Sequence, residues 1–273
     1  MRKMRKKSVF IIVWIVAATF FFRCGEESPT PPAQPQKAGT GSAATQGGNP
    51  PLPTPQPSFP TSSKPWPFIE EEPQDEELAR NLTAKNYALI FDGSGSMSES
   101  GCSDGLTKID AAKRAVAEWS KSVPEDANLA LVAFHQGKWS LLPLAGGQRT
   151  EFINLVQNMI AGGTTPLAEA FEKAYKALTV RGQAQLGYGN YTIVVVTDGQ
   201  ANNIRTLNQW VKHILANSPL NIYTIGFCIG NDHSLNQPGQ TVYKPANNPE
   251  ELRESLKEVL AEAETFDDSD FKE

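Results

Sequence analysis

Short apolar segments alternate with amphipathic segments over residues 87–263, and this alternation limits the folds open to the chain. The segments at 87–91 and 191–197 are apolar or β-branched throughout, as in strands buried on both faces. The segments between them repeat apolar residues at helical spacing. Such strands belong in a mostly parallel sheet covered by helices on both sides. The sequence therefore predicts a doubly wound α/β fold with a six-stranded sheet.

The expected elements alternate in a regular order. Strands are expected at 87–91, 129–134, 139–144, 191–197, 222–227 and 241–244. Helices are expected at 108–123, 151–160, 166–178, 207–216 and 249–263. In folds of this class, ligands bind beyond the carboxyl ends of the strands. The residues that follow the strands are therefore the candidates for function.

Oxygen-bearing side chains follow two of the apolar strands and precede one helix. The first strand ends in Asp92-Gly-Ser94-Gly-Ser96, the strand at 191–197 is followed by Asp198, and Gly-Gly-Thr-Thr-Pro spans 162–166. Each segment alone is typical of an ordinary turn or helix cap. Together, at one edge of the sheet, they form a set of hard oxygen ligands. Such ligands suit Mg²⁺, Mn²⁺ or Ca²⁺ better than Zn²⁺ or copper.

This order of residues resembles the metal-ion-dependent adhesion site of von Willebrand factor type A domains. The resemblance covers about residues 85–263 and rests on Asp92-x-Ser94-x-Ser96, a threonine loop and Asp198. It implies a doubly wound domain whose divalent cation, Mg²⁺ first and Mn²⁺ or Ca²⁺ as alternatives, is held by those four residues and one threonine. It also implies a protein partner whose acidic group completes the metal's shell.

Two adjacent threonines compete for the fifth position. Pro166 suits the first position of a helix, which makes Thr165 the expected N-cap. Its hydroxyl would then accept a backbone N–H. Thr164 follows Gly-Gly, as the ligand of the family does, and is the expected metal ligand.

The charge of these ligands favours binding over catalysis. Only Asp92 and Asp198 are anionic and the other donors are neutral, so a bound divalent ion keeps water that it can exchange for a partner's carboxylate. The sequence thus predicts a non-enzymatic protein-binding or adhesion module. A structural scaffold of a cell-envelope complex that binds without metal is the first alternative. A Mg²⁺-dependent phosphatase-like enzyme is the second, but Ser94 stands where it would need a second aspartate.

The first 24 residues have the pattern of an export signal. A basic cluster at 2–7 precedes 14 uncharged residues, Val9–Phe22, too short for an untilted membrane span. Cys24 follows where a bacterial lipoprotein carries its lipid, although Arg23 is unusual there. A lipoprotein, an uncleaved anchor and a freely secreted chain stay open. The expected location is the cell envelope, with the domain on the extracytoplasmic side.

Composition divides the rest of the chain. Of the 20 prolines, 12 lie between Pro29 and Pro67, and an acidic run follows them, so residues 25–81 are expected to form a disordered linker. The type A domain is expected at 82–266, with a polar tail at 267–273. The net charge of −5 gives no basic surface for nucleic acid.

The cysteines fit an exported chain. Cys102 and Cys228 both follow strands of the predicted sheet and should lie at its metal-binding edge. A disulfide between them would fix the loop 99–106 against the sheet, and two free thiols are the alternative.

Overall fold

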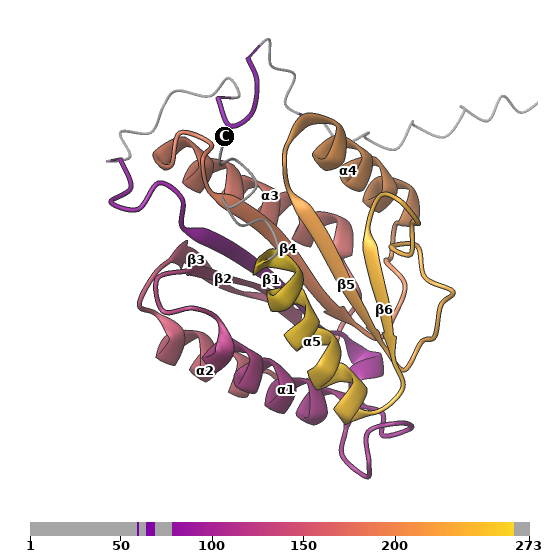
Figure 1. Ribbon diagram of the computed structural model, residues 1–273. Coiled ribbons are helices and arrows are strands. Elements are labelled where there is room, and N and C mark those ends of the chain that lie inside the picture. Colours follow the sequence, from indigo (N-terminus) through magenta and orange to yellow (C-terminus); the bar gives the residue numbers. More distant parts are fainter. Residues whose placement is uncertain (1–58, 60–63, 69–77, 265–273) are drawn as a thin grey trace, which may run out of the picture. The chain divides into compact units, whose positions relative to one another are not determined.

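The computed structural model describes residues 59, 64–68 and 78–264 (Figure 1). The strands in that part of the chain are β1 Lys85–Gly93, β2 Asn128–His135, β3 Lys138–Ala145, β4 Asn190–Thr197, β5 Asn221–Phe227 and β6 Val242–Ala246. The α-helices are α1 Lys108–Ser122, α2 Arg149–Gln157, α3 Leu167–Ala184, α4 Ile204–Asn217 and α5 Pro249–Glu264. A 3₁₀ turn at Gly95–Ser98 follows β1.

The six strands form one sheet in the order β3-β2-β1-β4-β5-β6. All neighbouring pairs are parallel except β2 and β3, which are antiparallel and joined through Gln136 and Gly137. Both of these residues have positive φ, as a tight hairpin turn requires. The predicted doubly wound, mostly parallel α/β fold is confirmed.

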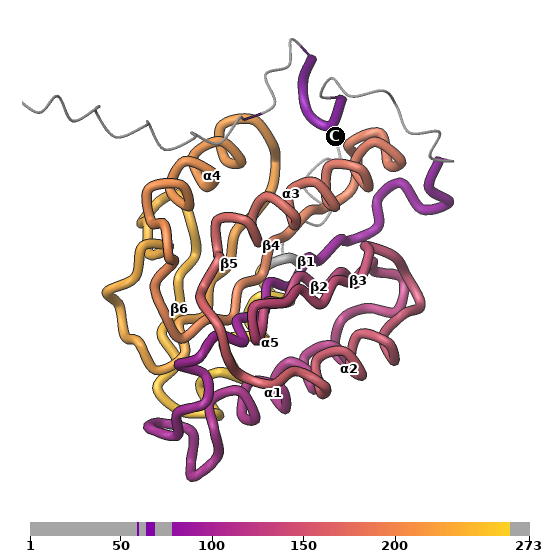
Figure 2. The backbone as a smooth tube through the Cα atoms, turned by 180° about the vertical axis from the view of Figure 1, so that it is seen from behind, coloured from indigo at the N-terminus to yellow at the C-terminus, as the bar shows by residue number. Residues whose placement is uncertain are grey.

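Helices cover both faces of the sheet (Figures 1 and 2). Helices α1, α2 and α5 pack on one face, where the core includes Trp119 and Phe152. Helices α3 and α4 pack on the other, where the core includes Phe171 and Trp210. The four inner strands β1, β2, β4 and β5 are almost fully buried between these layers, which is why their sequences are apolar on both faces.

Helix α3 extends to Ala184, beyond the predicted end at Leu178. The added turns bury Thr179 and Gly182, which do not look like core residues in sequence. They are covered by Trp66, from the segment that composition assigned to a disordered linker.

Trp66 packs on the domain. Its indole N–H donates to Thr179 Oγ1 at 3.0 Å, and its ring meets Tyr191 edge-to-face at 4.7 Å. A Cβ atom at Gly182 would lie 2.5 Å from a Trp66 ring atom, so this position has room only for glycine. Phe59 stacks on His213 of α4. The prediction of an unstructured linker over 25–81 is therefore wrong at these residues, because large aromatic side chains find apolar surface to cover.

We expect Trp66→Ala to lower the free energy of unfolding by about 2 kcal/mol, since it removes aromatic packing and one hydrogen bond. Urea unfolding of the full chain in mild detergent measures this. Phe68→Ala is the matched control, because Phe68 is 44% exposed. Equal stability of Trp66→Ala and the parent would show that the segment does not contribute to the fold.

Several predictions fall on residues outside those described. They are the export segment 1–24 with Cys24, most of the linker and the tail 267–273. Among the residues the structure describes, no helix combines the length and apolar character needed to cross a membrane.

Candidate metal centre

The candidate site lies where the order of the strands reverses. From β1 the chain moves to β2 on one side of the sheet and later returns to β4 on the other, so β1 and β4 are neighbours. Asp92 lies at the carboxyl end of β1, and Asp198 directly follows β4. Both carboxylates are buried, at 0% and 4% residue exposure. This is the place at which open α/β sheets bind ligands.

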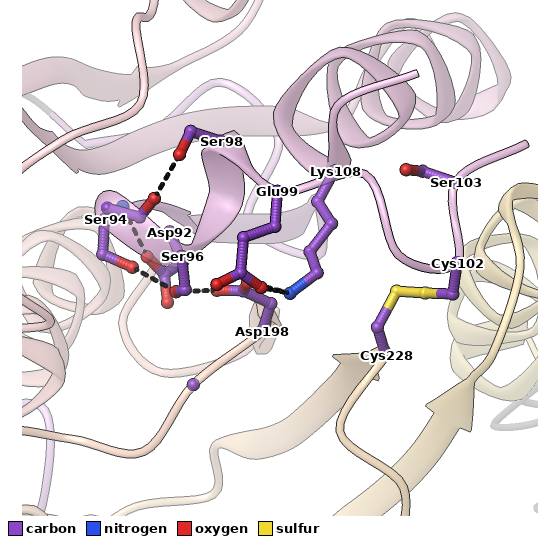
Figure 3. A network of polar contacts seen from close by, with 12 residues as sticks. Asp92, Ser94, Ser96, Ser98, Glu99, Cys102, Ser103, Lys108, Asp198 and Cys228 are labelled. Atoms are coloured by element: carbon purple, nitrogen blue, oxygen red, sulfur yellow. Dashed lines mark hydrogen bonds and ion pairs between the residues drawn. A yellow bond between two sulfur atoms is a disulfide. The ribbon is translucent and has the colours of Figure 1, made fainter. Parts of the chain in front are cut away.

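A chain of hydrogen bonds joins four of the predicted ligands (Figure 3). Asp92 Oδ1 accepts the backbone N–H of Ser94 at 2.8 Å. The hydroxyls of Ser94 and Ser96 are 3.2 Å apart, and Ser96 Oγ donates to Asp198 Oδ1 at 2.6 Å. The structure thus brings Asp92, Ser94, Ser96 and Asp198 into one cluster of oxygen atoms, called the oxygen cluster below.

Asp92 is buried, so keeping its carboxyl group ionised costs free energy. Burial raises its pKa to about 6, against an ordinary 3.8, and the charge of Asp198 acts in the same direction. Hydrogen bonds from Ser94 and from Thr197 Oγ1, the latter at 2.6 Å, act in the opposite direction but do not outweigh burial. A cation beside this carboxylate would offset the cost of keeping it charged.

The structure does not show the N-cap role that was expected of Thr165. Pro166 itself is the N-cap of α3, with no side-chain cap bond, so Thr165 is not the predicted cap. Its backbone instead bonds with Asn202 at both N–H and carbonyl. A Cβ atom at Gly199 would lie 3.7 Å from Ser96 Oγ and 3.9 Å from Thr165 Oγ1. The hydroxyls of Thr165 and Ser96 therefore both border the space beside Gly199.

Thr164, the predicted ligand, is exposed. It borders a pocket of about 210 Å³ that is also lined by His135, Trp139 and Glu169. The argument for Thr164 rested on Thr165 as the N-cap, and that premise is wrong because Pro166 occupies the cap position without a side-chain cap bond.

Close contacts with neighbouring backbone explain why glycine occupies positions 163 and 93. Gly163 has φ +86°, and a Cβ atom there would lie 2.6 Å from the Gly137 nitrogen. Its carbonyl accepts the N–H of Gly95 at 3.1 Å, which joins the threonine loop to the serine loop. A Cβ atom at Gly93 would meet His135 Cβ at 2.8 Å. Side chains at these positions would push the loops apart.

Lys108 is a residue at the site that the sequence reasoning missed. It is the first residue of α1, and its ammonium lies 2.9 Å from Asp198 Oδ2 and 2.9 Å from Glu99 Oε2. Burial alone would lower the pKa of Lys108, but the bonds and charges of Glu99 and Asp198 outweigh it and raise the pKa. A lysine at the start of a helix gives no sequence signal that it turns back toward a strand end.

His233 also lies close to the site, in the loop after β5. It is buried, and Nε2 is 2.9 Å from the carbonyl oxygen of Gly199. Burial lowers its pKa, with a smaller opposing contribution from the Gly199 carbonyl. The neutral ring then donates to that carbonyl and fixes the backbone after Asp198.

The predicted disulfide between Cys102 and Cys228 is present, with Cα atoms 6.1 Å apart (Figure 3). It ties the loop between β1 and α1 to the end of β5. That loop carries Glu99, whose backbone carbonyl accepts the N–H of Lys108 at 2.7 Å.

The donors fit a hard divalent cation. Two carboxylates and two or three hydroxyls match the preferences of Mg²⁺, Mn²⁺ and Ca²⁺. In the part of the chain that the structure describes, no group of three or more His, Cys, Asp or Glu side chains could hold a metal ion. Any metal at this site therefore depends on the hydroxyl groups as well.

Comparison with known proteins places this architecture in a family. Residues 87–200 match the family model of the von Willebrand factor type A domain, which includes both strand ends of the oxygen cluster. This part of the chain is a von Willebrand factor type A domain. An uncharacterised Bacillus subtilis protein, YwmD, is 30% identical over 132 residues, which are 42% of this chain and 55% of YwmD.

Solved structures share the fold at low identity. A von Willebrand factor type A protein from Catenulispora acidiphila has a TM-score of 0.53 at 19% identity, over 66% of this chain and 42% of that one. The Streptococcus sanguinis minor pilin PilB, as its D319A mutant, has a TM-score of 0.55 at 14% identity, over 68% and 62%. The Lactobacillus rhamnosus GG pilus adhesin SpaC has a TM-score of 0.52 at 13% identity, over 68% of this chain and 31% of SpaC. The chain thus spans less than two thirds of each relative.

Proposed function

We propose that this domain binds a divalent cation and, through it, a carboxylate of a protein partner. Asp92, Ser94, Ser96 and Asp198 would hold the ion. Thr165 would join them in place of Thr164, because its hydroxyl and that of Ser96 both lie within 4 Å of a Cβ position at Gly199, whereas Thr164 is exposed. Mg²⁺ is the first choice, with Mn²⁺ and Ca²⁺ as alternatives. When bound, the ion supplies positive charge and a coordination position that a partner's carboxylate can take.

The observation that carries this proposal is the oxygen cluster at the reversal point of the sheet. The carboxylates of Asp92 and Asp198 are both buried there, and the hydroxyls of Ser94 and Ser96 belong to the same hydrogen-bonded cluster. Carboxylates in such a position gain from a shared cation. The activity proposed is binding, since Ser94 leaves no second aspartate to act as proton donor.

The names of two relatives with this fold support an adhesive role. One is a pilus adhesin and another a minor pilin. We extend this to a tethered cell-envelope protein, with the basic and apolar segment 1–24 as anchor and the domain on the extracytoplasmic side.

The position of Trp66 suits that arrangement. It packs on Tyr191 near the start of β4, whereas the oxygen cluster lies at the end of that strand. Residues 192–197 of β4 lie between Tyr191 and Asp198 and separate them by about 23 Å along the strand. Residue Trp66 of the preceding segment thus joins the domain toward the edge opposite the proposed metal site, and among the described residues this segment does not cover the metal-binding edge.

Affinity capture tests this function. The full chain in mild detergent is immobilised, and an envelope extract from the cells that make it is applied in Mg²⁺. We expect bound proteins to elute with EDTA. We expect no retention by Asp92→Asn, nor after the carboxylates of the extract are converted to amides with carbodiimide and an amine. Asp126→Asn, on an exposed loop, is the charge-matched control.

Retention that survives both EDTA and amidation would contradict the proposal. The domain would then act as a metal-independent scaffold.

A further inference from the structure

The ammonium of Lys108 lies beside Asp198, at the end of the oxygen cluster away from Ser94 (Figure 3). Its side chain is 9% exposed, that of Asp198 is 0% exposed, and Nζ lies 2.9 Å from Oδ2. The other oxygen of Asp198, Oδ1, accepts the hydroxyl of Ser96. One face of this carboxylate therefore meets a fixed positive charge, and the other meets the side chains proposed to hold the metal.

In this arrangement both carboxylate oxygens of Asp198 have a partner without a metal ion. A fully buried carboxylate is costly unless it is paired and hydrogen-bonded, and Lys108 and Ser96 provide both conditions. Glu99 is the other partner of Lys108, but its side chain is 66% exposed. Water therefore screens Glu99, and Asp198 is the partner that depends on Lys108 most.

We propose that Lys108 is a built-in counter-ion that sets the metal affinity of the domain. It stabilises the metal-free fold by pairing with Asp198, and it repels a divalent ion bound by the same carboxylate. The ion is then held weakly until a second anion, the carboxylate of the partner, joins it. This inference rests on the proposed metal site and explains why occupancy of that site would depend on the partner.

The loop before α1 keeps the ammonium in place. The backbone N–H of Lys108 donates to the Glu99 carbonyl, and Cys102 anchors the same loop to Cys228. Lys108 is therefore held from both its backbone and its side chain. These contacts favour a Lys108 ammonium that stays beside Asp198 when a metal ion enters.

The test compares Lys108→Met and Lys108→Gln with the parent, all as full chains in mild detergent. Isothermal titration with MgCl₂ alone measures affinity, and thermal unfolding in EDTA measures the metal-free fold. We expect the substitutions to tighten the Mg²⁺ dissociation constant by about tenfold or more and to lower the melting temperature in EDTA. Lys121→Met, at the exposed end of α1, removes the same charge and should change neither quantity.

Lys108→Gln keeps a hydrogen-bond donor and serves if Lys108→Met does not fold. Suppose that the parent binds Mg²⁺ and that a Lys108 variant folds. If that variant then binds Mg²⁺ no more tightly than the parent, the role of Lys108 is overturned, while the metal site itself stands. Tight binding by the variant beside weak binding by the parent would support it. Absence of binding by the parent and both variants would overturn the metal site itself, and this inference with it.

Discussion

Saturating Mg²⁺ is expected to raise the melting temperature of the full chain by about 5–10 °C, and the Asp92→Ala variant is expected to show no rise. A ligand at a hundred times its dissociation constant adds about 2.7 kcal/mol to the stability of the folded state. For a domain of this size each kcal/mol corresponds to about 2–4 °C. Asp92 is central to the effect because it contributes one of the two carboxylates. Tryptophan fluorescence follows the melt, since Trp119 is buried in the core.

Matched variants sharpen this experiment. Asp126→Ala removes an exposed aspartate far along the chain from the site and should retain the full rise. Thr165→Val should reduce the rise, whereas Thr164→Val should leave it unchanged. A rise that persists in Asp92→Ala, or one that only Thr164→Val reduces, would contradict the assignment of Asp92 and Thr165 as metal ligands.

Replacing Cys102 and Cys228 together with serine is expected to lower the free energy of unfolding by about 4 kcal/mol. The disulfide closes a loop with a sequence separation of 126, so its loss frees a large part of the unfolded chain. Both cysteines are also partly buried against the core, which adds to the loss. Urea unfolding of the full chain, with and without reductant, measures the change.

Reductant should destabilise the parent and leave the double variant unaffected. Cys24→Ser is the control, because this cysteine lies outside the disulfide. Two thiols at positions 102 and 228 that react with an alkylating agent in the unreduced, folded chain would refute the bond.

The fold could be predicted because its strands are buried on both faces. The apolar segments at 87–91 and 191–197 have no polar side to present to water, so they require a parallel sheet between two layers of helices. The ends of these strands then had to meet at one edge. Asp92, Ser94, Ser96 and Asp198 could therefore be grouped from the order of residues along the chain.

The threonine and the lysine could not be assigned in the same way. Thr164 and Thr165 are adjacent and chemically identical, and only the folded structure shows that the hydroxyl of Thr165 borders the space beside Gly199. Lys108 follows the serine pair after a long loop, at the start of a helix. Its contact with Asp198 spans 90 residues and depends on how the loop folds back.

The sequence by itself determined the sheet, its helical layers and the grouping of four oxygen-bearing side chains, because hydrophobic periodicity and strand ends are local properties of the chain. The tertiary structure decided which threonine hydroxyl borders Gly199, which cation pairs with Asp198, and that Trp66 of the expected linker packs over Gly182. These depend on contacts between residues far apart in sequence. Their energies are set by packing and by distances between charges, which composition and spacing do not encode.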